Sequence, residues 1–424
     1  MDTIFALSSG APPAGIAVVR VSGPAAGAAL EGLAGKLPPP RMARLAQLRD
    51  GAGALLDEAL VLWFPGPASA TGEDLAEFHL HGGRAVVAAV ERALADMPGL
   101  RRAEGGEFTR RAFANGRIDL AEAEGLAELL GAESELQRLM ALERAGGTFS
   151  RQVNDWRERV LLLGAELEAE LDFADEDDVL ALGDAYFADI AALARDLGDW
   201  LARPRIERLG EGFRVVIAGP PNAGKSTLFN ALVESDAAIT SPTAGTTRDV
   251  LERTVAIGGV PFTLADTAGL RADHGDEIEA IGIARAQAAL ERADLVLWLG
   301  PEGEGPVGAW EIEAQCDLPA HSAKAAADHR LSAVTGEGLA RLQAALVAHA
   351  RASLPKPGEG ALNARQAQLV GEAEGALGAI SPQLDPLLVA ENLRVARQAF
   401  DRLTGHASTE DMLDTLFARF CIGK

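Results

Sequence analysis

The chain has 424 residues, of which 48% are hydrophobic, and its formal net charge is −23. That length predicts several folded domains, and the negative charge argues against a chain that wraps nucleic acid by bulk electrostatics. The two cysteines, Cys316 and Cys421, are too far apart in sequence to indicate a disulfide framework. The sequence has neither the basic start of a signal peptide nor an apolar run of about 18 residues. We therefore expect a cytoplasmic protein without a transmembrane helix.

Residues 1–116 have the pattern of a mixed α/β domain. Apolar and alternating runs predict strands at 16–21, 54–64 and 77–81, and an apolar face predicts a helix at 85–94. His79 and His81 share one face of the third strand. Because no third ligand is evident, a structural role or a place near a ligand is favoured over a metal site.

Residues 117–211 and 353–424 have the composition and spacing of helices. The acidic stretch 172–178 is expected to be a solvated loop between two of them. The segment between these helical parts, 212–352, has the strand pattern of a nucleotide-binding module. The economical packing is one helical domain built from both flanks, with the module inserted into it. Two separate helical appendages are the alternative.

A phosphate-binding loop lies at the start of this module. The apolar run Phe213–Ala218 predicts a buried strand, and Gly219–Ser226 fits the pattern G-x-x-x-x-G-K-[ST] before a helix expected at 227–233. Backbone N–H groups of such a loop face phosphates, and the helix N-terminus adds partial positive charge. Lys225 is predicted to reach the outer phosphates, and Ser226 to bind Mg²⁺.

Further elements expected of a switch-type NTPase follow in order. A polar stretch around Thr246 suits a segment that senses Mg²⁺ and the γ-phosphate, and a strand at 260–265 leads into the acid Asp266. Later strands are predicted at 293–299 and 331–334. The predicted nucleotide-binding residues are Asn222, Ala223, Gly224, Lys225, Ser226, Thr227, Ser241, Pro242, Thr243, Ala244, Gly245, Thr246, Thr247, Asp266, Thr267, Ala268, Gly269, Ser332, Ala333 and Val334.

Two features depart from a standard GTPase. Guanine selection normally needs Asn-Lys-x-Asp, but we find neither this tetrapeptide nor an apolar strand to carry it between Gly300 and Arg330, and the nearest segment is 322–328. Leu270 also stands where many GTPases place a water-orienting glutamine. Transition-state charge must then be handled by another group, such as a partner's arginine or a monovalent cation.

From end to end, the chain resembles the tRNA-modification GTPase family MnmE, also called TrmE, within the TrmE-Era-Septin-like P-loop GTPases. The terminal Cys421–Lys424 is especially diagnostic, because such an ending serves no generic purpose. The segments that carry the resemblance are Asp2–Phe5, Thr71–Asp74, His81–Gly83, Gly105–Thr109, Arg111–Phe113, Ile118–Ala123, Leu171–Phe173, Pro221–Ser226, Ala244–Asp249, Asp266–Arg271 and Phe420–Lys424.

The resemblance implies a fold and a function. It implies an N-terminal α/β domain that dimerises and binds a formyl or methylene tetrahydrofolate, a helical domain from two segments, and an inserted Ras-like P-loop G domain. It also implies a heterotetramer with the flavoprotein MnmG (GidA), which modifies C5 of the wobble uridine of certain tRNAs. GTP hydrolysis would be coupled to that reaction and stimulated by K⁺-dependent association of G domains.

The resemblance also implies roles for single residues. Asn222, Ser241, Thr243 and Thr246 match a K⁺ site, Ser226 and Thr247 match the Mg²⁺ ligands, and Glu279 matches an acid that positions the attacking water. Lys225, Asn222 and Glu279 would thus be the catalytic set. Arg20, Glu77, Arg117 and Lys424 match folate-contacting positions. Cys421 is a candidate reactive thiol, with packing as the alternative.

The base-reading segment leaves other functions open. Ala323–Ala326 takes the place of Asn-Lys-x-Asp without its Asn and Asp, which puts guanine selectivity in question. One alternative is a regulatory or ribosome-assembly GTPase. The other is a folate-binding scaffold whose G domain has degenerated.

Overall fold

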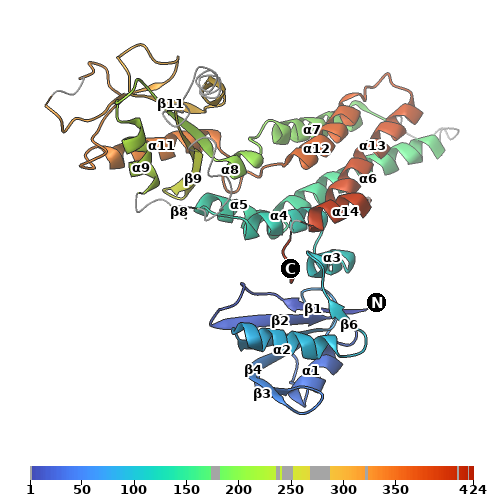
Figure 1. The fold of residues 1–424 in the computed structure, drawn as a ribbon. Coiled ribbons are helices and arrows are strands. Elements are labelled where there is room, and N and C mark those ends of the chain that lie inside the picture. Colours follow the sequence, from blue (N-terminus) through green and yellow to red (C-terminus); the bar gives the residue numbers. More distant parts are fainter. Residues whose placement is uncertain are drawn as a thin grey trace, which may run out of the picture. The chain divides into compact units, whose positions relative to one another are not determined.

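The computed structural model describes residues 2–172, 182–234, 239–240, 252–267, 287–319, 323–407, 410–418 and 420–424. Contacts divide the chain into two compact units. We call residues 1–127 with 401–424 the N-terminal unit, and residues 128–400 the central unit. Figure 1 shows a sheet covered by helices in the first unit and, in the second, a group of helices and a second sheet.

The N-terminal unit is built on a six-stranded sheet of order β3-β4-β5-β2-β1-β6. Helices α1 (Ala26–Ala34) and α2 (Arg84–Ala95) cover one face of it (Figure 1). Alternation along β2 buries Ala17, Val19 and Val21 beneath these helices. The predicted strands and the predicted helix are therefore confirmed. The strands are β1 (Thr3–Leu7), β2 (Ile16–Ser22), β3 (Arg44–Arg49), β4 (Leu55–Phe64), β5 (Leu75–His81) and β6 (Leu100–Arg102).

The C-terminus of the chain packs within the same unit. Helices α3 (Glu107–Ala114) and α14 (Glu410–Phe417) meet through the rings of Phe113 and Phe417, whose centroids lie 6.1 Å apart. Beyond α14, a β-bridge joins Ile422 to Gly105. Gly423 has φ 95°, and a Cβ there would lie 2.0 Å from the Leu7 carbonyl oxygen. Only glycine fits this close approach.

Helices from both sides of the nucleotide module share one core in the central unit. Trp156 on α6 lies 5.5 Å from the ring of Trp200 on α7 and 5.9 Å from that of Phe400 on α13. Helices α7 and α12 run side by side (Figure 1). One helical domain from two chain segments is therefore confirmed, and separate appendages are excluded. The helices of the central unit are α5 (Glu135–Ala145), α6 (Thr148–Asp172), α7 (Asp184–Leu201), α8 (Glu207–Glu211), α11 (Leu339–Ser353) and α12 (Ala364–Gly378). Helix α4 (Leu120–Leu130) begins in the N-terminal unit, and α13 (Pro386–Thr404) ends in it.

Of the predicted acidic loop, only Asp172 is described, and it ends α6 rather than opening a loop. The remaining residues of the stretch lie outside the described part of the chain. Among the described residues, no helix is long and apolar enough to cross a membrane.

The nucleotide module has a seven-stranded sheet of order β13-β12-β11-β7-β10-β9-β8. Strand β7 lies between β10 and β11 and is parallel to both. This position explains its continuous apolar run, because a central parallel strand is covered on both faces. The elements are β7 (Phe213–Ala218), α9 (Lys225–Val233), β8 (Ile239–Thr240), β9 (Glu252–Ile257), β10 (Val260–Asp266), β11 (Leu295–Trp298), β12 (Trp310–Glu313) and β13 (His329–Arg330).

One strand of this module was not predicted, and one was misplaced. Strand β12 lies between Gly300 and Arg330 and pairs in parallel with β11. Its four residues alternate Trp and Ile with glutamates, so no apolar run marks it. The last strand is not 331–334 but β13, two residues earlier in the chain. The printed ladder ends at Arg330, although the backbone N–H of the buried Leu331 still donates to the Glu313 carbonyl oxygen of β12, and Val334 is 76% exposed.

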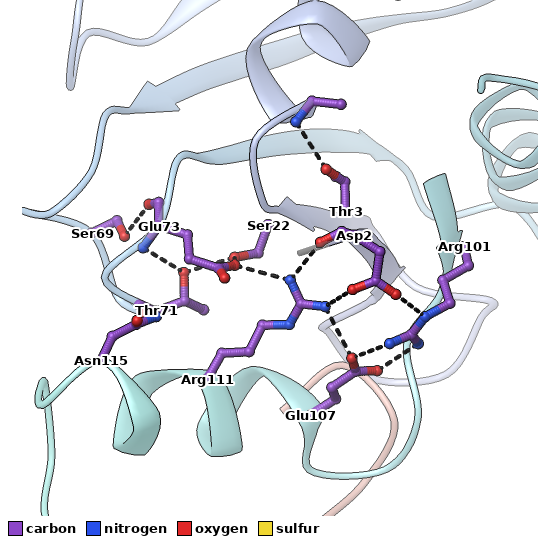
Figure 2. Close-up of polar contacts among 11 residues, drawn as sticks. Asp2, Thr3, Ser22, Ser69, Thr71, Glu73, Arg101, Glu107, Arg111 and Asn115 are labelled. Atoms are coloured by element: carbon purple, nitrogen blue, oxygen red, sulfur yellow. Dashed lines mark hydrogen bonds and ion pairs between the residues drawn. The ribbon is translucent and has the colours of Figure 1, made fainter. Parts of the chain in front are cut away.

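An ionic network ties four distant segments of the N-terminal unit together (Figure 2). The Arg111 guanidinium donates to Asp2 at 2.8 Å, to Glu73 at 3.0 Å and to Glu107 at 3.1 Å. Arg101 binds both Asp2 and Glu107. Ser22 donates to Glu73 at 2.9 Å. Segments singled out in the sequence thus meet around one mostly buried arginine.

Two acids of this network, Asp2 and Glu107, have lowered pKa values. Burial opposes ionisation of Glu107, but hydrogen bonds from Arg101 and Arg111 outweigh it and lower its pKa. The hydrogen bond from Arg101 is the main cause that lowers the pKa of Asp2. Asp2 and Glu107 also bind Arg101, so loss of Arg111 would leave Glu73, whose side chain is 12% exposed, without its cation.

We expect Arg111→Ala to destabilise the N-terminal unit by about 2–4 kcal/mol, because it leaves Glu73 buried without its cation. Arg49→Ala is the control, since it removes only exposed hydrogen bonds to Gly53 and Gln47 and should cost about 1 kcal/mol or less. Hydrogen exchange of α3 amides in the whole chain measures the loss of stability in both variants. Equal protection of α3 in the two variants would contradict a stabilising role for Arg111.

Candidate nucleotide-binding site

The phosphate loop follows the carboxyl end of β7. Gly224 caps the N-terminus of α9 with φ 91°. Gly219 has φ 150°, and a Cβ there would lie 3.1 Å from the backbone of Leu299 and Gly300. Both glycines are therefore required, the first by its left-handed conformation and the second by the neighbouring strand end. The loop directs its backbone toward the space outside the strand ends, where ligands of parallel sheets bind.

Three predicted phosphate-site residues converge at this edge. Lys225 is 6% exposed, and its ammonium donates to the Pro220 carbonyl oxygen at 2.7 Å. The Ser226 hydroxyl donates to Asp266 Oδ2 at 2.6 Å, although they are 40 residues apart. Parallel pairing places Asp266 opposite Ile217, near the end of β7. A hydroxyl and a fully buried carboxylate in contact are the oxygen donors that suit Mg²⁺.

The flanking residues are also placed. Thr267 donates to the Ile217 carbonyl oxygen at 3.0 Å, which holds the end of β10 against β7. Asn222 is exposed and has φ 64°, a conformation that asparagine tolerates better than most residues. No hydrogen bond of its side chain joins it to another residue in the described part of the chain.

Several predicted site residues lie outside the described residues: Ser241, Pro242, Thr243, Ala244, Gly245, Thr246, Thr247, Ala268, Gly269, Leu270 and Glu279. Their predicted roles stay predictions.

A cavity of about 110 Å³ adjoins the phosphate loop. Its lining includes Gly224 and Thr227 from the start of α9, Gln315 and Asp317 from the loop after β12, and Ala333 and Val334. Two of the three residues predicted at 332–334 thus line it. Ser332 instead is buried and accepts a hydrogen bond from the Thr335 backbone at 3.1 Å, which shapes the turn.

The segment Ala323–Ala326, considered for the base-reading role, does not line this cavity. The buried ammonium of Lys324 donates to the Trp298 carbonyl oxygen at 2.8 Å and to Glu311 at 2.6 Å, and so fastens a loop to the sheet. Ala314, Gln315 and Asp317, from the segment Ala314-Gln-Cys-Asp317 directly after β12, do line the cavity. This segment keeps the acid of Asn-Lys-x-Asp at the fourth position. Had β12 been recognised in the sequence, Asp317 would have stood out as an acid shortly after a sheet strand.

The N-terminal unit holds the predicted folate residues. Arg20 on β2 faces Glu77 on β5 across the ladder, with Nη2 and Oε1 2.7 Å apart. His79 Nε2 lies 3.2 Å from the other Glu77 oxygen. Burial raises the cost of ionising Glu77, but the bonds from Arg20 and His79 prevail and lower its pKa. The guanidinium of Arg20 also lies 6.0 Å from the centre of the Phe108 ring.

The other predicted N-terminal residues do not join this pair through any contact among the described residues. The backbone N–H of Arg117 donates to Ala112, and that of Lys424 donates to Cys421. Cys421 is an exposed free thiol, and Cys316 is also free. His81 pairs with Asp57 at 2.7 Å rather than with His79. Within the described ranges, no group of three or more His, Cys, Asp or Glu residues could hold a metal ion.

Comparison with known proteins covers the whole chain. Residues 3–117 match the family model "GTP-binding protein TrmE N-terminus", and residues 120–421 match "MnmE helical domain". A tRNA modification GTPase MnmE of Erythrobacter litoralis is 65% identical over 424 residues, with all of both chains covered. The chain belongs to the MnmE family. The MnmE of Novosphingobium aromaticivorans is 63% identical, and that of Zymomonas mobilis is 51% identical, again over the full length of both chains.

The two MnmE family models divide the chain near residue 118. The TrmE N-terminal match ends where α3 gives way to α4, and the helical match spans both segments that flank the nucleotide module. The resemblance drawn from short motifs in the sequence is thereby confirmed for the chain as a whole.

In Glu77→Gln, we expect the stability of the N-terminal unit to fall less steeply as the pH is lowered. Because the folded pKa of Glu77 is below its ordinary value of 4.5, its contribution is present above pH 4.5 and is lost as pH falls through the folded value. Hydrogen exchange of β2 and β5 amides from about pH 6 to about pH 3 measures this slope. Glu58→Gln, which removes an exposed carboxyl on β4, is the control. Parallel slopes in the two variants would contradict the assignment.

Proposed function

We propose that this chain hydrolyses GTP in tRNA modification, and that the coupled reaction alters C5 of the wobble uridine of certain tRNAs. The observation that carries the proposal is the full-length likeness to proteins named tRNA modification GTPase MnmE. It is supported by the convergence of Lys225, Ser226 and Asp266 at the end of β7. The one-carbon unit would come from a formyl or methylene tetrahydrofolate, and the partner would be the flavoprotein MnmG in a cytoplasmic heterotetramer.

We assign each proposed function to one domain of the chain. Residues 1–116 would dimerise and bind folate, residues 117–211 and 353–424 would form the helical domain, and residues 212–352 would bind and hydrolyse GTP. The Arg20–Glu77 pair supports a folate site, because a guanidinium and a carboxylate offer donors and acceptors to a polar heterocycle. Arg117 and Lys424 would complete it, and Cys421 is the candidate thiol.

The phosphate chemistry follows from the loop. Lys225 would exchange its bond to Pro220 for the outer phosphates, and the backbone N–H groups after Asn222 would hold their oxygens. Ser226, Asp266 and Thr247 would hold Mg²⁺, which neutralises phosphate charge when bound. Asn222 would hold K⁺ together with Ser241, Thr243 and Thr246. Glu279 would orient the attacking water, since Leu270 cannot.

Base selection is assigned to Asp317. Its position after β12 and on the cavity wall, beside Ala333 and Thr227, supports this role. A carboxylate there accepts from the two neighbouring N–H donors of guanine. The idea of a degenerate scaffold rested on a missing base-reading acid, and Asp317 removes that support.

We expect Asp317→Asn to weaken GTP binding by about 10- to 100-fold, because it removes a charged acceptor for two base donors. Binding of XTP should improve, since an amide N–H can donate to the oxygen that replaces the amino group of guanine. Competition among GTP, XTP and ATP against a fluorescent nucleotide measures both effects. Asp328→Asn, in the segment first assigned to the base, is the control and should leave the ranking of nucleotides unchanged.

We expect phosphate release from GTP to rise by about tenfold or more when K⁺ replaces Na⁺, because the cation supplies positive charge near the phosphates. Asn222→Ala should abolish most of that rise. Release is measured at saturating GTP in the two salts at equal ionic strength. Hydrolysis that does not respond to the exchange of salts would remove the cation site from the proposal.

A further inference from the structure

A second cavity, of about 350 Å³, lies at the amino end of β7, beside the turn that follows α8. Gly212 lies in its wall directly before β7, and Asp294 lies there directly before the parallel strand β11. The phosphate loop follows the carboxyl end of β7, so this cavity and the nucleotide site lie at opposite ends of the same strands. Its volume is in the range of cavities that hold small molecules.

Three arginines from separate elements line this cavity: Arg208 on α8, Arg214 on β7 and Arg292 in the turn before β11. Asp294 accepts from Arg208 at 3.3 Å and from the backbone N–H of Arg214 at 2.9 Å. Its carboxylate therefore neutralises the first arginine only. In the described part of the chain, the guanidinium groups of Arg214 and Arg292 form no ion pair or hydrogen bond.

The chemistry of two such groups indicates the ligand. Two like charges on one cavity repel each other, and an anion between them removes this repulsion. Each guanidinium presents a planar fork of N–H donors that matches phosphate oxygens, and a phosphate has enough oxygens for two forks at once. The chain carries a net charge of −23, so its surface as a whole does not attract anions. The two guanidinium groups are therefore a local exception.

The rest of the wall moderates this attraction. Leu354 is 3% exposed and adds an apolar surface to the lining. Glu211, at the end of α8, adds an exposed carboxylate that would repel an anion. The arginines and this glutamate must then affect an anion in opposite directions, which gives the site a test by sign.

We propose that this cavity binds a small phosphate anion between Arg214 and Arg292, with Arg208 as a further source of positive charge. The bound anion would join α8, β7 and the turn before β11 at the end of the sheet away from the nucleotide. The proposal does not rest on GTP hydrolysis, because this cavity shares no lining residue with the one beside the phosphate loop.

The test titrates inorganic pyrophosphate into the nucleotide-free full-length chain and measures the heat of binding. Every titration uses the Lys225→Ala background, because the phosphate-loop lysine would also bind the probe. Arg214→Gln and Arg292→Gln should each weaken binding by about 5-fold or more, since each removes charge-assisted hydrogen bonds. Glu211→Gln should tighten binding by about 2-fold, since it removes a repelling charge. Arg341→Gln, an exposed arginine outside the lining, is the matched control and should leave the affinity unchanged.

Two further measurements locate the probe and identify the source of the phosphate. Bound pyrophosphate should slow hydrogen exchange of the amides of 207–216 in the same background. Ribose 5-phosphate is titrated in parallel: tighter binding than pyrophosphate indicates an organic phosphate ester, and weaker binding indicates an inorganic one.

The outcomes that overturn the proposal are specific. They are no binding of either probe, or equal affinities in Arg214→Gln, Arg292→Gln and the control. A structural defect in the arginine variants would lower their thermal midpoints, and Glu211→Gln then decides alone. An affinity that Glu211→Gln does not raise would overturn the site, whether or not the chain hydrolyses GTP.

Discussion

The nucleotide site depends on parallel pairing around β7. Parallel strands end at the same edge of a sheet, so pairing of β7 with β10 brings Ser226 and Asp266 to 2.6 Å, although 40 residues separate them. Pairing of β7 with β11, and of β11 with β12, brings the loop that contains Gln315 and Asp317 to the same edge. The continuous apolar run of β7 suits this central place, because a strand between two parallel neighbours is covered on both faces.

A second constraint governs the N-terminal unit. Arg111 binds acids from the start of the chain, from the loop before β5 and from the first turn of its own helix. Each acid would be costly to bury alone, and the arginine is satisfied only when all three segments are in place. The network therefore holds α3 and the N-terminus on the sheet that carries Arg20 and Glu77.

The base-reading loop illustrates what sequence patterns miss. A four-residue strand with two glutamates gives no apolar run, and β12 is recognisable only through its pairing with β11. Without that strand, the sequence does not show that Asp317 follows the end of a sheet strand. The segment around Lys324 is then the nearest match to Asn-Lys-x-Asp. In the structure, that lysine is used to neutralise Glu311. The strand predicted at 331–334 fails for a different reason, because the apolar residues of this segment follow β13 without extending its ladder, and Val334 is exposed.

The sequence by itself determined the phosphate loop with its strand and helix, the α/β character of the N-terminal segment, the helical flanks and the family. These features depend on local spacing and on short motifs, which are readable without contacts. Only the tertiary structure decided that the two helical flanks share one core, that Asp317 rather than the segment around Lys324 faces the pocket, and that three arginines of separate elements line one cavity. Each of these depends on side chains brought together across many residues, and no local pattern encodes which distant partner a side chain will meet.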